Sequence, residues 1–134
     1  MIRQPTPHAT AYAWHTAALA GDEPVTTDEP QAGWFKRRLV KGGPFVPARI
    51  WLEQPVDLGS GELIDDERLQ CEVNGAWADA AEQWPWLCGN PISRAEFDYL
   101  TASLAWSAQH APDEPRANPR QPIDWLKVPA PTFT

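Results

Sequence analysis

The pattern of apolar and polar positions predicts a β-hairpin between residues 33 and 53. Two segments, 34–40 and 45–53, are rich in aromatic and β-branched side chains, and Lys41-Gly42-Gly43-Pro44 provides a turn between them. Successive side chains of a strand point to opposite faces. One face of the second segment is uniformly apolar and is expected to lie in the core: Val46, Ala48, Ile50 and Leu52. The opposite face is expected to point to solvent and carries Phe45, Pro47, Arg49 and Trp51.

Pro47 affects the placement of this second strand. Proline has no amide donor for a sheet ladder, so it is usually confined to edge strands and bulges. Its position within residues 45–53 therefore predicts an edge strand or a bulge.

A second hairpin is predicted between residues 69 and 78. Asn74-Gly75 is a typical dipeptide of a type I′ turn, because both residues tolerate the positive φ values that the turn requires. In the strand before it, Leu69, Cys71 and Val73 alternate with polar residues and are expected to face the core. The Gly-rich acidic stretch 55–69 is expected to form a loop between the two hairpins.

Three segments show helical patterns. The alanine-rich segment His8–Ala20 predicts a short helix that ends at Gly21 and carries Tyr12, His15 and Leu19 on one face. Residues 78–84 predict a second short helix, stopped by Pro85. The capping box Ser93-Arg-Ala-Glu96 begins a helix that extends to about His110. The buried stripe of this last helix is expected to comprise Phe97, Leu100, Leu104 and Ala108.

Tyr99 and Trp106 lie off that stripe, seven residues apart on a second face of the same helix. They indicate either a helix that is buried on two sides, which is the alternative we favour, or an exposed aromatic strip that binds a partner. From Pro112 onward six of 23 residues are proline, which predicts an extended strap rather than regular structure. Ile123, Trp125 and Leu126 are expected to hold this strap against the body.

These elements predict one small α+β domain with two β-hairpins, one main C-terminal helix and an extended Pro-rich tail. We expect residues 1–32 to form a short helix and an acidic linker, residues 33–110 the α+β core, and residues 111–134 the strap. A chain of 134 residues typically forms a single domain. No apolar run approaches the ~20 residues that cross a bilayer, and the N-terminus lacks the pattern of a secretory signal. We therefore expect a cytoplasmic protein with no membrane contact.

Charge is strongly segregated along the chain. Five of its eleven basic residues fall between positions 36 and 49, and no acidic residue occurs between positions 30 and 52. The other six basic residues stand against eighteen acidic ones, a balance of −12 (6 − 18) in a chain of net charge −7. We call residues 33–53 the basic hairpin. Its candidate binding residues are Trp34, Lys36, Arg37, Arg38, Lys41, Phe45, Arg49 and Trp51.

Three interpretations of the basic hairpin remain open. Arginine beside aromatic rings suits single-stranded nucleic acid, where bases stack and phosphates are neutralised. The same residue types dominate protein–protein hot spots. Alternatively, the cations pair with the protein's own acidic loops at residues 22–29 and 62–67.

No pattern of catalytic or metal-binding residues stands out. His8, His15 and His110 have no ligand at motif spacing and are expected to be surface or helix-end residues. Cys71 and Cys88 are far apart and are expected to be small buried thiols in a reducing compartment. Asp65, Asp66 and Glu67 sit in a hydrophilic loop without the desolvation that tunes a general acid. We therefore expect no metal, no cofactor and no enzymatic activity.

Three motifs resemble an uncharacterised family of small proteins encoded by tailed phages and prophages of proteobacteria: RRLVKGGPFVPARIW, WPWLCGNPIS and ANPRQPID. The resemblance covers about residues 33–131 and implies a context rather than an activity, namely a virus-borne accessory protein in the host cytoplasm. Small acidic phage proteins of this size are often stoichiometric binders, including inhibitors of host defence nucleases. The expected function is therefore binding to a host or phage protein, with an anti-CRISPR-like inhibitor as one specialisation. Nucleic-acid binding through the basic hairpin is the alternative.

Overall fold

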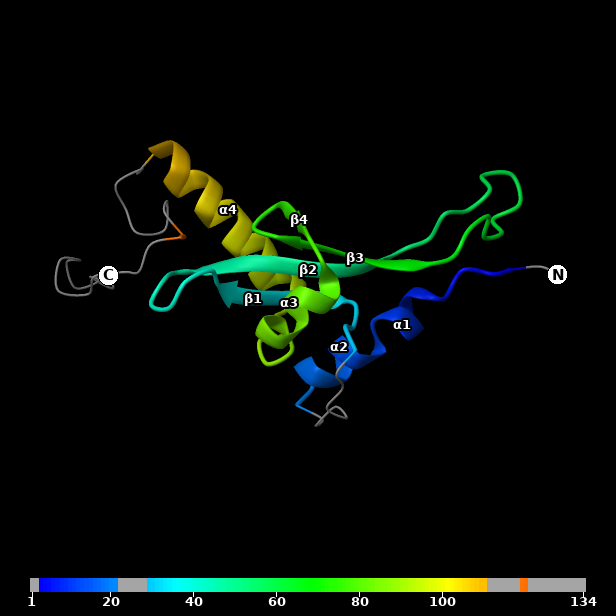
Figure 1. Ribbon diagram of the computed structural model, residues 1–134, viewed down its shortest axis with the longest axis horizontal. Coiled ribbons are helices and arrows are strands. Elements are labelled where there is room, and N and C mark those ends of the chain that lie inside the picture. The colour runs from blue at the N-terminus through cyan, green and yellow to red at the C-terminus, as the bar shows by residue number, and fades with distance from the viewer. Residues whose placement is uncertain (1–2, 22–28, 111–118, 121–134) are drawn as a thin grey trace.

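The computed structural model describes residues 3–21, 29–110 and 119–120. Its centre is a four-stranded antiparallel sheet in the order β1-β2-β3-β4 (Figure 1). The strands are β1 (Gly33–Arg38), β2 (Phe45–Glu53), β3 (Arg68–Val73) and β4 (Ala76–Ala78). Four helices accompany them: α1 (His8–Ala11), α2 (Ala13–Leu19), α3 (Ala80–Leu87) and α4 (Arg94–His110). The predicted α+β class is confirmed, and the two predicted hairpins join into one sheet.

Turn chemistry explains why both hairpins form where the sequence predicts them. Asn74 and Gly75 adopt φ values of 52° and 79°, as the type I′ turn between β3 and β4 requires. In the first hairpin the second strand has the predicted bounds, whereas the first ends two residues earlier than predicted, because Arg38 is the last residue of β1 to pair, opposite Phe45. The connection closes with a hydrogen bond from the Gly43 amide to the Val40 carbonyl at 3.0 Å, and Gly42 takes a φ of 78°.

The prediction that Pro47 marks an edge strand is wrong, because β2 pairs with β1 on one side and β3 on the other. The ladder to β3 begins at Ala48, one residue after Pro47. At Pro47 itself the chain opposite has entered the β3–β4 turn, and the Asn74 amide donates to the Pro47 carbonyl at 2.8 Å. Pro47 therefore lies just outside the β2–β3 ladder, where its lack of an amide hydrogen removes no ladder hydrogen bond.

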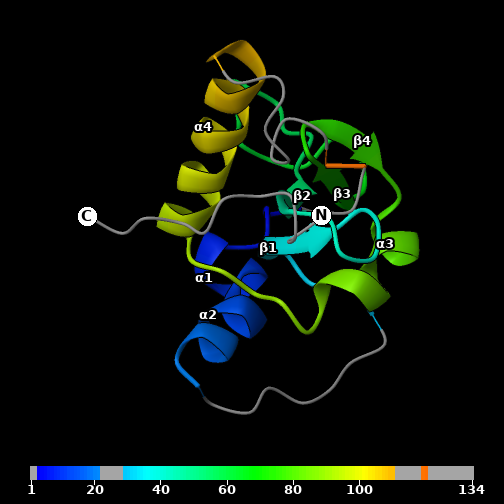
Figure 2. The same cartoon turned by 90° about the vertical axis from the view of Figure 1, so that its left-hand side faces the viewer.

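The core lies between one face of the sheet and α3. As predicted, Val46, Ala48 and Ile50 of β2 are buried, while Leu52 is only half-buried. Cys71 and Val73 of β3 share this face, also as predicted. The other buried members of the cluster come from β1 and α3: Phe35, Ala80, Trp84 and Leu87. Figure 2 shows α3 on this side of the sheet and α4 on the opposite side.

The placement of α4 corrects the expectation that the Arg49 face of β2 points to solvent. This helix packs on β1 and β2, and Pro47 is buried beneath it. The predicted N-cap is confirmed, since Ser93 Oγ accepts the Glu96 amide at 3.1 Å. The predicted buried stripe is only partly right: Phe97, Leu100 and Leu104 are half-buried, Ala108 is exposed and Ser107 is the buried residue. Tyr99 and Trp106 are 63% and 55% exposed, so the favoured burial on two sides is wrong.

The N-terminal helix is divided into α1 and α2 at Tyr12, where the sequence predicts one continuous helix. Gly21 follows α2 with a φ of 79°, as predicted for its cap. On the face predicted for this helix, His15 is buried but Leu19 is exposed. Trp14, which was not assigned to that face, packs against the core.

Pro85 does not stop α3, which continues to Leu87. Asp79 caps this helix by accepting the amides of Ala81 and Glu82 at 2.8 and 3.2 Å. After Pro85 the helical pattern resumes, since the Cys88 amide donates to the Trp84 carbonyl at 2.9 Å. Pro85 is exposed, whereas burial of Trp84 and Leu87 on either side fixes the helix against the sheet.

The outer edge of β1 is lined by the segment between α3 and α4. Lys36 donates its amide to the Asn90 carbonyl at 3.2 Å, and Ile92 donates to the Trp34 carbonyl at 2.9 Å. These bonds satisfy an edge that would otherwise be open to pairing. Among the residues that the structure describes, no helix has the length and apolar character needed to cross a membrane. The predicted strap at 111–134 lies outside the described residues except for Pro119 and Arg120.

Candidate functional site

Strand register divides the candidate residues of the basic hairpin between two faces of the sheet. Trp34 is opposite Arg49, Lys36 opposite Pro47, and Arg38 opposite Phe45. Six candidate residues therefore share the face that α4 partly covers: Trp34, Lys36, Arg38, Phe45, Arg49 and Trp51. Arg37 lies on the other face, as the predicted alternation requires, and Lys41 is exposed in the connection.

On the α4 face each cation lies over an aromatic ring. The Lys36 Nζ and Arg38 Cζ atoms are 4.8 and 4.2 Å from the centroid of the Phe45 ring. The Arg49 Cζ atom is 4.3 Å from the Trp51 ring centroid. Cation–π contacts at exposed sites contribute about 0.5–1 kcal/mol, which is enough to favour these side-chain positions. The basic hairpin thus presents ordered guanidinium–ring stacks.

Two of these cations already have carboxylate partners. Lys36 Nζ is 3.1 Å from Glu96 Oε2 of α4. Arg49 donates through Nε and Nη2 to the two carboxylate oxygens of Glu72, both at 3.2 Å. The two-bond geometry fixes the Arg49 side chain more strongly than a single contact would. Internal pairing therefore occurs, although its partners come from α4 and β3.

The acidic loops were expected to pair with the basic hairpin, but the 62–67 loop contacts other residues. In the 62–67 loop, Asp66 pairs with Arg3 at 2.6 Å and Asp65 lies 3.9 Å from Arg68. Glu67 accepts hydrogen bonds from Gln54 and from Thr6, and these bonds lower the pKa of its carboxyl group. This loop thus holds the N-terminal segment rather than the basic hairpin. Residues 22–28 lie outside the described residues.

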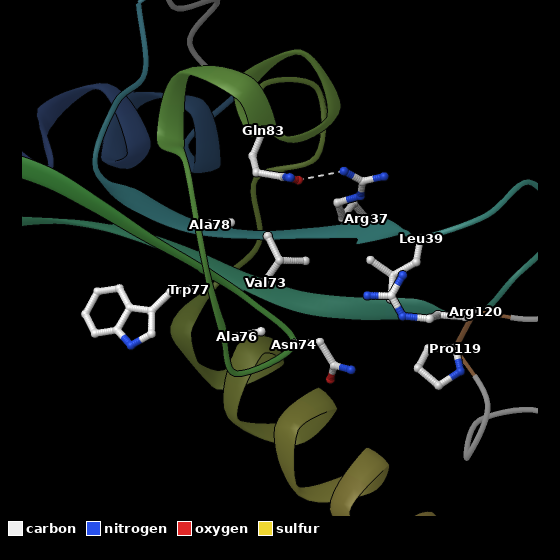
Figure 3. Close-up of a pocket in the computed structure, with 10 residues that line it drawn as sticks. All are labelled: Arg37, Leu39, Val73, Asn74, Ala76, Trp77, Ala78, Gln83, Pro119 and Arg120. Atoms are coloured by element: carbon white, nitrogen blue, oxygen red, sulfur yellow. Dashed lines mark hydrogen bonds between the residues drawn. The ribbon is translucent and has the colours of Figure 1, made fainter.

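Arg37 occupies a separate environment against α3. Its Nη1 donates to Gln83 Oε1 at 2.6 Å, and its Nε donates to the Arg38 carbonyl at 3.1 Å. The guanidinium carbon lies 5.1 Å from the centroid of the exposed Trp86 ring. Figure 3 shows Arg37 beside a hollow whose wall also includes Arg120.

The most exposed aromatic ring near the basic hairpin is one that sequence analysis did not select. Trp77 of β4 is 71% exposed, and its ring centroid is 5.5 Å from that of Trp51 at an interplanar angle of 50°. Trp77 pairs with Glu72, so its side chain shares the outward face of Glu72 and Arg49. The signal was present in the sequence, because extending the predicted β3 alternation through the type I′ turn places Trp77 outside. We call Arg49, Trp51 and Trp77 the tryptophan cluster.

His15 is buried, with 3% of its surface exposed, so the prediction of a surface or helix-end residue is wrong for it. Its Nε2 lies 3.0 Å from the Trp34 carbonyl oxygen and 2.8 Å from that of Ile92. Because carbonyls only accept, Nε2 carries the hydrogen and bridges β1 to the segment before α4. His15 therefore has a structural position. His8 and His110 are exposed, as predicted.

The other candidate groups for metal binding or reactivity are the carboxylates and the two cysteines. Within the described ranges, no group of three His, Cys, Asp or Glu side chains could hold a metal ion. Cys71 and Cys88 are both free thiols; Cys71 is buried as predicted, and Cys88 is half-buried. Burial raises the pKa of Cys71 to about 11, which disfavours the reactive thiolate.

Comparison with known proteins adds no assignment, since no protein-family model, curated protein or solved structure matches this chain.

Proposed function

We propose that this chain is a non-enzymatic accessory protein of a phage or mobile element, which binds a host or phage protein through the tryptophan cluster. The observation that carries the proposal is the 71% exposure of Trp77, on a three-residue edge strand, beside a Trp51–Arg49 stack. The phage context rests on the resemblance of three sequence motifs. Inhibition of a host defence system, in the manner of an anti-CRISPR protein, is the specialised form of this proposal.

The chemistry of the tryptophan cluster supports a protein contact. Tryptophan and arginine are the residues most enriched among binding hot spots, because they combine large apolar area with directed donors. Here Trp51 and Glu72 hold Arg49 in place, so little side-chain freedom is lost on binding. The exposed Trp77 ring supplies the apolar area that a partner would bury.

The electrostatics of the basic hairpin favour a protein partner over nucleic acid. Affinity for nucleic acid comes mainly from cations that neutralise phosphates. Lys36 and Arg49 are already neutralised by Glu96 and Glu72, and the whole chain carries a charge of −7. Bringing a phosphate strand to this face would require those ion pairs to rearrange.

A capture experiment tests this proposal. Tagged wild-type protein and the variants Trp77→Ala and Trp106→Ala would be used to capture partners from lysates of infected and uninfected host cells, with and without nuclease. Trp106 is the matched control, since its ring is 55% exposed but lies on α4. We expect a protein that survives nuclease treatment, is lost with Trp77→Ala and is retained with Trp106→Ala. Equal capture by all three proteins would show that the tryptophan cluster is not the contact.

Nucleic-acid binding is the second candidate, and Arg38 and Lys41 favour it. Within the described part of the chain neither has a carboxylate within ion-pair distance, so both are open to phosphate. Titration of the protein with an oligothymidine strand at increasing salt separates the candidates. Phosphate binding weakens steeply as salt rises, whereas an aromatic protein interface weakens modestly. Absence of oligothymidine binding at low salt would eliminate this second candidate.

A further inference from the structure

The hollow beside Arg37 has an unusual charge for this protein. It has a volume of about 540 Å³, and ten of the residues that the structure describes line it, from the end of β1, the β3–β4 hairpin, α3 and positions 119–120 (Figure 3). Two of the ten are arginines, Arg37 and Arg120, and none is acidic. A cavity with two positive charges is a distinct feature of a chain whose net charge is −7.

Unlike Lys36 and Arg49, Arg37 lacks a carboxylate partner among the described residues. Lys36 and Arg49 each have one, at 3.1 and 3.2 Å, whereas the side-chain partner of Arg37 is the neutral Gln83. Partial burial removes water from this guanidinium and lowers its pKa. A partly buried guanidinium is stabilised by a nearby negative charge, and an oxyanion in the hollow would supply one.

The geometry of Arg37 leaves donors available to such an anion. A guanidinium has five N–H donors, and the bonds to Gln83 and to the Arg38 carbonyl use two of them, which leaves three. Those two bonds and the Trp86 ring hold the group in one orientation, so little freedom is lost when it binds. Arg120 adds a second guanidinium to the same wall, and Asn74 adds a neutral amide (Figure 3).

We propose that this hollow is an anion-binding site that receives a single phosphate or carboxylate group between Arg37 and Arg120. Arginine suits both groups, because its planar set of N–H donors matches two oxygens at once. The hollow and the proposed protein contact share one lining residue, Trp77, but their charged groups lie on different faces of the sheet. Arg37 projects from the α3 face of the sheet, whereas the tryptophan cluster lies on the α4 face, and Figure 3 shows the Trp77 ring pointing away from Arg37.

The test needs only the purified full-length chain. Arginine Nε–Hε NMR signals would be followed during titration with sodium phosphate, and separately with sodium acetate, with chloride used to keep ionic strength constant. We expect saturable shifts of the Arg37 and Arg120 signals. Arg94 of α4 is the internal control, since it lies 5.6 Å from the Trp34 ring centroid on the other face of the sheet and does not line the hollow. A stronger response to phosphate would identify a phosphate-bearing ligand, and a stronger response to acetate a carboxylate.

Variants complete the test. Arg37→Gln and Arg120→Gln should each weaken anion binding about tenfold, because each removes charge-assisted hydrogen bonds, while Arg94→Gln should leave it unchanged. Arg120 is exposed, so its variant remains informative if Arg37→Gln does not fold. The proposal is overturned if the Arg37, Arg120 and Arg94 signals move together without saturation, or if Arg37→Gln and Arg120→Gln both bind the anion as the wild type does.

Discussion

Replacing Gly33 with alanine should be one of the most destabilising small changes in this protein. Gly33 is a buried residue of β1 that packs against the side chain of His15. A Cβ atom at this position would lie 2.5 Å from His15 Cδ2, 2.7 Å from Cγ and 2.9 Å from Cβ. These separations are far shorter than the carbon–carbon contact distance of about 3.5–4.0 Å. The imidazole or the strand must therefore move.

The expected cost of Gly33→Ala combines two effects. Inserting a methyl group into a packed site costs about 1–3 kcal/mol in strain. Displacing the ring also breaks the His15 hydrogen bonds to the Trp34 and Ile92 carbonyls, and a buried polar group left without a partner costs about 1–3 kcal/mol. We therefore expect the free energy of unfolding to fall by about 2–6 kcal/mol, a large part of the stability of a typical domain.

Urea denaturation followed by tryptophan fluorescence measures this change. Gly89→Ala is the matched control, because a Cβ at Gly89 would meet no atom within 4 Å, and its effect should stay within about 0.5 kcal/mol. In a His15→Ala background the Gly33→Ala change should cost less, since the two nearest atoms that the new methyl group meets, Cδ2 and Cγ, are absent and only Cβ, at 2.9 Å, remains. The reasoning is refuted if Gly33→Ala costs no more than Gly89→Ala, or costs the same with and without His15.

Three further predictions concern single groups. Burial, followed by the charges of Asp79 and Glu72, raises the pKa of Cys71 to about 11, so the unfolding free energy should be unaffected below pH 9 and fall between about pH 9 and 11. Urea titrations across that range should show a smaller fall for Cys71→Ala. Hydrogen bonds from Gln54 and Thr6 lower the pKa of Glu67, so its stabilising contribution should be present above about pH 4.5 and be lost as pH falls through the lower folded-state value. The NMR shift of the Thr6 amide should report this titration and show none in Glu67→Gln. Removing the α3 cap with Asp79→Ala should cost about 0.5–2 kcal/mol in urea denaturation, and no loss would mean that the cap is dispensable.

Local chemistry explains which parts of the fold were predictable. Asn74-Gly75 defines a turn from two residues alone, and the alternation around it identifies Cys71 and Val73 as core residues. Ser93 caps α4 for an equally local reason. Each of these signals depends only on residues a few positions apart, so the turn, the core residues beside it and the helix cap can be predicted from the sequence alone.

Several of the errors concern contacts between distant segments, beside the local ones at Pro85 and Tyr12. The Arg49 face is covered because α4 packs on it, and strand periodicity does not indicate which helix packs on which face. His15 is buried because its partners are carbonyls of residues 34 and 92, which local spacing does not bring together. Strand alternation, which is local, correctly assigned the residues of the basic hairpin to the two faces of the sheet. The carboxylate partners of Lys36 and Arg49 were not identified, because they lie on other segments of the chain.

The His15 bridge has a consequence for the order in which the protein folds. Each strand of the sheet pairs with its neighbour in sequence, whereas the bond from His15 to Ile92 joins residues 77 positions apart. Closing a long segment costs more chain entropy than closing a hairpin, so we expect the hairpins to form first and the bridge to close last. Contacts that form after the transition state act mainly on the unfolding rate. The buried imidazole would then govern how long a folded molecule persists, while the Asn74-Gly75 turn governs how quickly one is made.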